Sequence, residues 1–260
     1  MADRTFRVIV LAAQRKGVTD PLAARFGTSH KCLVPLAGEP LIAHVLRTVA
    51  SHPRVTSVVV SIEPEVFEPL RRAVPDVAIT PVRAADNIAD SVTLAAAGHY
   101  GPLLITTADN ALLTHRSMDA MMCTADTSDA AVGMATRDRV LAAHPEGQRR
   151  FYRFRDGEFS NCNLYCIANL KACRAAEIFR GGGQFAKKAQ RIVEAFGLTN
   201  LVLLRLRLLA LDTALRRIST RVGVNIAPVI LSDGSQAIDV DNDRTYAIVE
   251  TLIRRQAAFA

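Results

Sequence analysis

The sequence is poor in aromatic side chains, which make up 5% of its residues, and it contains no tryptophan. It also lacks a run of roughly 18 uncharged apolar residues, which a membrane-spanning helix would need. The N-terminal stretch MADRTFRVIVLAAQ places charges beside a short apolar run and has no signal-peptide cleavage pattern. We therefore expect a cytoplasmic protein without a transmembrane segment.

The cysteines follow no pattern that indicates a disulfide framework or a metal site. The chain has five cysteines, an odd number, and none of them forms a CxxC pair. Disulfide frameworks use an even number of cysteines, and zinc sites use regular spacings of Cys and His that are not found here. Free or buried thiols in a reducing compartment account for this usage.

Acidic residues are scarce in two basic segments. Residues 180–221 contain nine Lys and Arg against two acidic residues, and residues 137–155 contain six Arg against two acidic residues. The formal net charge of the whole chain is +7, so the remainder is net acidic. Basic segments of this kind attract partners that carry phosphate. No nucleic-acid partner is expected, because the chain shows no helix-turn-helix, zinc finger or aromatic-rich RNA-binding surface.

Hydrophobic residues make up 50% of the sequence, enough for the core of one large α/β domain over residues 1–260. In the first half, short β-branched runs alternate with helical segments. The predicted strands are Phe6–Ala12, Ser57–Ile62, Val77–Thr80, Leu103–Thr107 and Ala130–Ala135; the predicted helices are Leu41–Ala50, Val66–Ala73, Ser91–His99 (capped by Asp90 or Ser91) and one from Thr114 through Cys123. This alternation predicts a doubly wound, mostly parallel mixed sheet of Rossmann-like type. Such sheets bind ligands at the carboxyl ends of their strands.

The second half is less regular and predicts a helical insertion over residues 180–222 within the same domain. The predicted elements are a hairpin at Tyr152–Phe159, strands at Asn163–Ile167, Val229–Leu231 and Ala237–Val240, helices at Gln184–Phe196 and Leu201–Arg217, and a final helix Asp243–Ala258 capped by Asp243.

The most specific pattern is KCLVPLAGEPLI at residues 31–42, downstream of a strand that ends in LAA. The two stretches resemble the signature of the nucleotidyltransferases with the glycosyltransferase-A-like fold, LAAG-x-G-x-R followed by K-x-L-x-x-hydrophobic-x-G-x-P and two hydrophobic residues. The positions that match the second block are Lys31, Leu33, Leu36, Gly38, Pro40, Leu41 and Ile42. The resemblance covers residues 6–167 and 225–255, and the family includes molybdenum-cofactor guanylyltransferases and methylerythritol-phosphate cytidylyltransferases.

The resemblance implies an enzyme that transfers a nucleoside monophosphate from an NTP, with CTP favoured, to a phosphorylated acceptor, and releases pyrophosphate. The acceptor would be a small-molecule or lipid-linked alcohol or sugar, and Mg²⁺ would be the cofactor. Two alternatives stay open. One is a guanylyltransferase of the molybdenum-cofactor or cobinamide-phosphate type, and the other is a non-catalytic phosphate- or nucleic-acid-binding protein on the same fold.

On the nucleotide side, the resemblance places Lys31 at the triphosphate, where an ammonium group would neutralise charge beside the α-phosphate. The first signature block differs, because Gln14 stands where the family has its first glycine. A loop with fewer glycines keeps backbone amides farther from phosphate, so Arg15 or Lys16, with Arg25 as an alternative, would supply the contacts. The other residues expected to line the nucleotide here are Leu11, Ala12, Ala13 and Gln14.

Carboxylates follow two of the predicted strands. Asp109 comes after Leu103–Thr107 and matches the family aspartate that binds Mg²⁺, a metal that takes few carboxylates together with phosphate oxygens. The stretch AIDVDNDRTY at residues 237–246 resembles the late family motif D-x-D-T-P-E-D-L. Asp239 and Asp241 would face one side of a strand and point to the metal. Which of the two is the ligand, and whether one or two metals bind, stays open.

The resemblance also names residues for the nucleoside and the acceptor. In the segment ADNIADSVTLAA at residues 85–96, Ser91 and Asp90 would contact the nucleoside, with a pyrimidine base favoured. On the acceptor side, arginines that alternate along a strand would bind phosphate, and an asparagine would hydrogen-bond the substrate. The residues are Arg149, Arg150, Arg153 and Arg155, with Asn163 or Asn161.

Residues 198–217 are apolar nearly all round, with Arg205 and Arg207 on roughly opposite sides. Such a helix packs against its own protein, forms a homodimer interface, or lies on a membrane surface with its arginines reaching to the headgroups. These three possibilities stay open.

Overall fold

The computed structural model describes residues 4–14, 17–169, 172–173 and 198–259. Among them is an eight-stranded mixed sheet with the order β10-β7-β9-β6-β1-β4-β5, in which β8 pairs with β9. The strands are β1 Phe6–Leu11, β4 Val55–Ile62, β5 Thr80–Arg83, β6 Leu103–Thr107, β7 Ala130–Thr136, β8 Tyr152–Phe154, β9 Gly157–Ile167 and β10 Ile226–Ile230. A two-residue pairing joins β2 Pro35–Leu36 to β3 Glu39–Pro40. The predicted mostly parallel sheet is confirmed.

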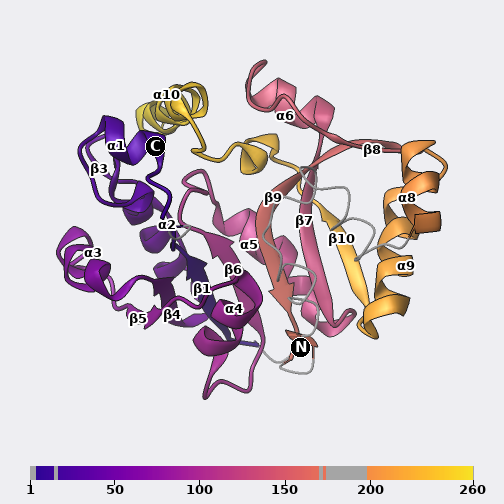
Figure 1. The fold of residues 1–260 in the computed structure, drawn as a ribbon, viewed down its shortest axis with the longest axis horizontal. Helices are drawn as coiled ribbons and strands as arrows, with labels where there is room; N and C mark the ends of the chain where they lie inside the picture. Colours follow the sequence, from indigo (N-terminus) through magenta and orange to yellow (C-terminus); the bar gives the residue numbers. More distant parts are fainter. Residues whose placement is uncertain (1–3, 15–16, 170–171, 174–197, 260) are drawn as a thin grey trace.

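Helices cover both faces of the sheet, as the alternation of strands and helices predicts (Figure 1). The helices are α1 Pro21–Arg25, α2 Leu41–Ala50, α3 Phe67–Ala73, α4 Ile88–Ala96, α5 His115–Met122, α6 Arg137–Ala143, α8 Leu198–Arg205, α9 Leu211–Val222 and α10 Asp243–Phe259. Short 3₁₀ turns are η1 Lys31–Leu33, η2 Pro64–Val66, η3 Cys123–Asp126 and η6 Gly234–Ala237.

Strand β1 shows why this sheet is buried on both sides. Val8 and Val10 belong to the core cluster that contains α2, α5 and α10, whereas Ile9 belongs to the cluster that contains α4 and α9. All three side chains are fully buried. Successive side chains of a strand point to opposite faces, so a continuous apolar run suits a strand with helices above and below it.

The strand directions bring several loop starts to one edge. β1 is parallel to β4 and β6, and β10 is parallel to β7, while β9 runs antiparallel between β6 and β7. The carboxyl ends of β1, β4, β6, β7 and β10 therefore meet at the same edge. The segment from β10 through η6 to α10 crosses this edge, as the yellow chain in Figure 1 shows.

Two predicted helix caps are wrong, and one is confirmed. Helix α4 begins earlier than expected, because the side chain of Asn87 accepts the Asp90 N–H at 3.0 Å and caps the helix. Asn242 caps α10 by accepting the Thr245 N–H at 3.2 Å, so Asp243 is the first helical residue and not the cap. Thr114 caps α5 as predicted. An Asn side chain satisfies a free helical N–H as well as Asp does, and its position relative to the first turn decides the cap.

The single helix predicted over Leu201–Arg217 is wrong, because two helices occupy this segment. Helix α8 ends at Arg205. Two residues later, Arg207 has a left-handed φ of 56°, and the Leu208 N–H donates to the Leu203 carbonyl at 2.9 Å, as in a Schellman motif. The side chain of Asp156 then accepts the Leu211 N–H at 3.0 Å and caps α9 from the β8–β9 hairpin. The segment is helical by propensity alone, but the left-handed turn at Arg207 and the tertiary contact of Asp156 divide it into two helices.

Two other predictions for the second half differ from the structure or lie outside it. Residues Ala237–Val240 do not form a strand; Ala237 ends η6, and extended backbone follows. The helix predicted at Gln184–Phe196 lies outside the described residues, as does part of the insertion predicted over 180–222. No helix among the described residues is long and apolar enough to cross a membrane.

Candidate functional site

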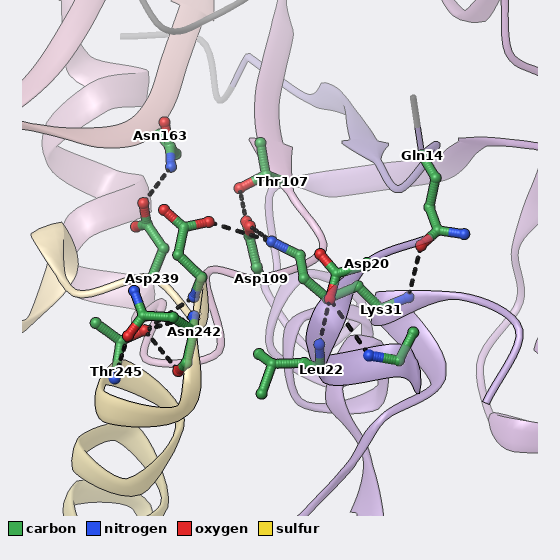
Figure 2. A network of polar contacts seen from close by, with 12 residues as sticks. Gln14, Asp20, Leu22, Lys31, Thr107, Asp109, Asn163, Asp239, Asn242 and Thr245 are labelled. Carbon is green, nitrogen blue, oxygen red and sulfur yellow. Dashed lines mark hydrogen bonds and ion pairs between the residues drawn. The ribbon is translucent and has the colours of Figure 1, made fainter. Parts of the chain in front are cut away.

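Three chain segments meet at the carboxyl edge of the sheet and bring charged side chains together (Figure 2). One segment is the loop from β1 through η1, which carries Lys31. The second is the turn after β6, which carries Asp109. The third precedes α10 and carries Asp239 and Asp241. We call the group formed by Lys31, Asp109, Asp239 and Asp241 the lysine–carboxylate cluster.

Lys31 joins two of the carboxylates. Its Nζ lies 2.5 Å from Asp109 Oδ2 and 3.3 Å from Asp241 Oδ1. Burial alone would lower the pKa of Lys31, but the negative charges of the two aspartates outweigh that effect and hold the pKa above its ordinary value. The ammonium group is therefore charged at every physiological pH and supplies a fixed positive charge at this edge.

Asp109 is held as a carboxylate by its neighbours. The Thr107 hydroxyl donates to Asp109 Oδ1 at 2.5 Å, and Lys31 donates to the other oxygen. Burial would raise the pKa of Asp109, but the charge of Lys31 and these hydrogen bonds lower it below its ordinary value. The backbone carbonyl of Asp109 also accepts the Val240 N–H at 3.1 Å, which ties the turn after β6 to the segment before α10.

The pKa of Asp239 is shifted in the opposite direction from that of Asp109. Asn163 donates to its Oδ2 at 2.7 Å, but its buried Oδ1 has no hydrogen-bond partner within the described part of the chain. Burial, followed by the negative charges of Asp109 and Asp241, raises the pKa of Asp239 well above its ordinary value. A carboxylate oxygen that is buried and unpartnered beside two other carboxylates is an arrangement that a bound cation would stabilise.

Asp241 lies at the exposed side of the cluster. Its Oδ1 contacts Lys31, and its backbone N–H donates to the Thr245 hydroxyl at 2.9 Å. The expectation that Asp239 and Asp241 face one side of a strand is wrong in its reason, since there is no strand. The turn before α10 nevertheless brings both side chains to the same cluster, because Asp241 contacts Lys31 and Asp239 lies beside Asp109 (Figure 2).

The chemistry of these oxygens fits a hard cation such as Mg²⁺. Asp109, Asp239 and Asp241 supply carboxylates from two loops, although among the described residues no group of three or more His, Cys, Asp or Glu side chains is arranged to hold a metal ion. Mg²⁺ usually keeps waters and substrate phosphates in its coordination shell and takes one or two carboxylates from the protein. An open carboxylate set is therefore suited to a metal that arrives with a nucleotide.

The side chain of Gln14 links the start of the loop after β1 to Ser29 and Lys31 at the end of the same segment. Its Oε1 accepts the Lys31 N–H at 3.4 Å, and its Nε2 donates to the Ser29 carbonyl at 2.9 Å. Its own backbone N–H donates to Glu63 Oε1 at 2.8 Å. The residue that replaces a family glycine therefore supports the backbone of Lys31, and its N–H is already occupied by a side chain.

The remaining residues of the first loop are placed in part. Leu11 ends β1, and the Ala12 N–H continues the pairing with β4 through the Ser61 carbonyl at 2.9 Å. Ala13 is exposed. Arg15 and Lys16, expected to contact phosphates, lie outside the described residues. The alternative residue, Arg25, forms an ion pair with Asp243 at 2.6 Å.

Sequence reasoning missed Glu63, which directly follows β4 at the same edge. Its carboxylate accepts the Gln14 N–H and lies 3.4 Å from His30 Nε2. The signal was available, because a polar residue at the carboxyl end of a central parallel strand is a site candidate. Thr107, the last residue of β6, was missed for the same reason.

Ser91 and Asp90 lie in the first turn of α4, and both take part in local hydrogen bonds. The Ser91 hydroxyl accepts the Ala85 N–H at 3.0 Å, and the residue is 5% exposed. Asp90 accepts from the Asn87 side chain at 2.6 Å. These bonds order the loop between β5 and α4. The contact with a nucleoside stays a prediction.

The arginines expected on the acceptor side do not share one strand. Arg149 and Arg150 are exposed residues of the loop before β8, and Arg153 is the one that lies within that strand. Arg155 lies in the turn after β8, so the expected alternation along one strand is wrong for Arg149, Arg150 and Arg155. Asn163, also expected to meet the acceptor, donates to Asp239 and has a left-handed φ of 48° within β9.

The chain matches the sequence model of the MobA-like NTP transferase domain over residues 8–218. A comparison with curated proteins gave no match. The chain therefore belongs to the family of MobA-like NTP transferase domains and is a nucleotidyltransferase. This assignment confirms the resemblance drawn from the sequence and favours an enzyme over a non-catalytic binding protein.

Solved structures share the fold. A hypothetical transferase from Thermus thermophilus is 23% identical with a TM-score of 0.76, and the match covers 93% of this chain and 99% of that one. CMP:2-keto-3-deoxy-manno-octonic acid synthetase in complex with CTP is 14% identical with a TM-score of 0.59, covering 97% and 100%. 4-Diphosphocytidyl-2C-methyl-D-erythritol synthase from Anaerococcus prevotii DSM 20548 is 8% identical with a TM-score of 0.59, covering 97% of each chain.

Proposed function

We propose that this MobA-like NTP transferase uses Mg²⁺ to transfer a nucleoside monophosphate from an NTP to a phosphorylated small-molecule or lipid-linked acceptor. The observation that carries this proposal is the lysine–carboxylate cluster at the carboxyl edge of the sheet. Lys31 lies between Asp109 and Asp241, and the unpartnered oxygen of Asp239 lies beside them. A triphosphate with its metal brings the charges that this cluster complements.

The reaction needs no strong general base. An oxygen of the acceptor phosphate, already ionised at neutral pH, attacks the α-phosphorus in line. A new phosphorus–oxygen bond forms, the bond to the bridging oxygen breaks, and pyrophosphate leaves with that electron pair. Catalysis then depends on positioning and on neutralising negative charge. Lys31 would supply charge beside the α-phosphate, and Gln14 would keep its backbone in place.

Mg²⁺, when bound, would neutralise the triphosphate and the charge that develops during transfer. Asp109 and Asp239, with Asp241 at the exposed side, are the residues that would hold it. The raised pKa of Asp239 supports this role, because its carboxylate needs a cation before it can share the cluster with two other carboxylates. Lys31 would then be released toward the phosphates.

CTP is the nucleotide that we propose. Two of the solved structures with this fold carry names that include a cytidine nucleotide, and one of them is in complex with CTP. A guanylyltransferase activity of the molybdenum-cofactor or cobinamide-phosphate type is the second candidate, which the MobA-like family assignment supports. The base contacts of α4, with Ser91 and Asp90, would differ between these candidates.

The test is an assay of the whole protein with Mg²⁺, each of the four NTPs, and a panel of phosphorylated alcohols and sugars. We expect pyrophosphate release and a new nucleoside diphosphate product, identified by mass, for one pairing. The Asp109→Asn variant should give neither. Pyrophosphate release that is equal in wild type and Asp109→Asn would contradict the proposal, as would NTP binding that does not depend on Mg²⁺.

A further inference from the structure

A second charged feature lies at the same edge of the sheet, away from the lysine–carboxylate cluster. Helix α6, the loop that follows it and the β8–β9 hairpin enclose a cavity of about 340 Å³. The residues that matter for its chemistry are Arg137, Gln148, Arg149, Phe151, Arg153 and Glu158. Three arginines against one glutamate give the cavity a positive balance. We call it the arginine cavity.

Glu158 holds two of these arginines in place. Its Oε1 lies 2.9 Å from Arg153 Nε, and its Oε2 lies 3.3 Å from Arg137 Nε. Both contacts are made by the Nε atom of the arginine. Arg137 also lies over the ring of Phe151, 6.0 Å from its centroid. One carboxylate therefore orients two guanidinium groups.

The third arginine adds charge with a weaker tie. Arg149 lies 3.9 Å from Glu146, at the limit of an ion pair. Nearby, Arg244 in the first turn of α10 has a buried Nη1 without a hydrogen-bond partner among the described residues. The pKa of Arg244 is lowered first by burial and then by the positive charge of Arg149, which lies near enough to repel it. An anion between such groups would relieve their repulsion.

The arginine cavity shares a wall with the segment that carries the aspartates. Gln148 donates from Nε2 to the Ala237 carbonyl at 3.5 Å, two residues before Asp239. Arg137 directly follows β7, whose carboxyl end lies at the same edge as that of β6. An acceptor bound in the cavity would therefore lie next to the proposed site of transfer.

We propose that the arginine cavity binds a phosphate group of the acceptor and that Arg137 and Arg153 are its principal contacts. Guanidinium groups offer paired donors that match phosphate oxygens, and Glu158 is a positioning residue that presents them. The acceptor is thereby a phosphomonoester. In naming the acceptor as the source of the phosphate, this inference rests on the proposed function.

The test measures binding of inorganic phosphate to the whole protein by calorimetry, at constant ionic strength. The double variant Arg137→Gln/Arg153→Gln should lose at least tenfold in phosphate affinity. Arg71→Gln is the matched control, since it removes an exposed arginine that pairs with Glu68 on α3 and does not line the cavity. Lys31→Met removes the proposed triphosphate contact instead. Both of these variants should bind phosphate like the wild type.

Three results would overturn the inference: no phosphate binding, equal binding in the double variant, or binding lost in Lys31→Met alone. Glycerol 3-phosphate should compete with inorganic phosphate, and a failure to compete would assign the cavity to free phosphate and not to an acceptor. Arginine-dependent binding without pyrophosphate release would uphold the cavity and contradict the proposed function. Pyrophosphate release that is equal in the wild type and the double variant would uphold the proposed function and contradict the role of the arginine cavity.

Discussion

The two charged features at the carboxyl edge are built differently. In the lysine–carboxylate cluster the side chains of Lys31 and Asp109 are 21% and 14% exposed, and backbone or side-chain contacts fix each of them. In the arginine cavity the side chains of Arg149 and Arg153 are 69% and 61% exposed, and single carboxylates hold them. The first feature is pre-organised and the second is adaptable.

Because of this difference, we expect the cluster to affect turnover and the cavity to affect acceptor binding. A pre-organised group that stabilises the transition state more than the ground state contributes to kcat, whereas a group that holds the acceptor phosphate equally in both states contributes mainly to KM. Changes in the cluster should therefore lower turnover and alter stability. Changes in the cavity should alter acceptor affinity with little effect on folding.

The largest effect is expected for Asp109→Asn. The substitution keeps the shape of the side chain but removes the charge that pairs with Lys31 and would hold the metal. Loss of several kcal/mol of charge stabilisation corresponds to a fall in kcat of roughly 10³-fold. Steady-state pyrophosphate release measures it. Asp243→Asn, which removes the exposed carboxylate that pairs with Arg25, serves as control and should keep full activity.

Lys31→Met should be next, with turnover lowered by roughly 10²-fold. In chelator it should also destabilise the protein by about 3–5 kcal/mol, because Asp109 is left without its ion-pair partner. Urea unfolding measures this loss, and Mg²⁺ should restore part of it. The double variant Lys31→Met/Asp109→Asn should regain stability over Lys31→Met. Equal stability of all three proteins in chelator would show that the cluster is not pre-organised by this pair.

A smaller effect of opposite sign is expected for Asp239→Asn in chelator. The pKa of Asp239 is raised in the folded state, so the unfolded chain releases its proton at lower pH than the folded protein does. The stability that depends on this group is complete below the unfolded pKa of about 4 and falls as the pH rises. Asn carries no charge and can still accept from Asn163.

Asp239→Asn should therefore be more stable than the wild type at pH 8 by on the order of 1 kcal/mol, with no difference near pH 4. Denaturant unfolding across this pH range measures it. The same variant should bind Mg²⁺ with NTP more weakly. A stability difference that is independent of pH would mean that ionisation of the buried Asp239 carboxyl group does not destabilise the folded protein.

The sequence predicted the members of the cluster mainly through the resemblance to the nucleotidyltransferase signature, which named Lys31, Asp109, Asp239 and Asp241. Lys31 and Asp109 also follow buried strands, β1 and β6, whose carboxyl ends lie at the same sheet edge. Strand order then brings residues far apart in the chain together. That reasoning needs no side-chain contact, and so it succeeded where propensity was strong.

What the sequence did not predict depends on single tertiary contacts. Asp156 caps α9 from a distant hairpin and divides a segment that is helical by composition. Glu158 pairs with Arg153, one of the four arginines expected on the acceptor side, and with Arg137, which was not among them. Gln14 turns inward to support Lys31 where the family pattern has a glycine. No period or motif encodes such contacts, because they depend on which side chains the fold brings within reach.

The arginine cavity should contribute little to stability, in contrast to the cluster. Its ion pairs are exposed, and exposed pairs contribute roughly 0–1 kcal/mol. Glu158→Gln should therefore change the free energy of unfolding by less than about 1 kcal/mol while it raises the acceptor KM several-fold. Chemical denaturation and steady-state kinetics measure the two effects. A stability loss in Glu158→Gln as large as that in Lys31→Met would contradict the expectation that the arginine cavity contributes little to stability.

The smallest effect concerns the edge of the molecule beyond the cavity, where α8 ends. Val202, Leu206 and Leu208 are exposed beside Arg205 and Arg207, a combination suited to an anionic membrane surface. We expect a few-fold increase in sedimentation with vesicles that contain anionic lipid over neutral vesicles, reduced in Leu206→Ser/Leu208→Ser. Leu94→Ser, which removes an exposed leucine on α4, is the matched control.

Equal sedimentation of the control and the double variant would mean that these leucines do not contact lipid. Analytical ultracentrifugation of the same variants then tests the other open role, a homodimer interface. A monomer–dimer equilibrium that shifts to monomer in Leu206→Ser/Leu208→Ser would assign the face to a second copy. A lipid-linked acceptor would require contact of this face with the membrane, since its phosphate must reach the arginine cavity while its chain stays in the membrane.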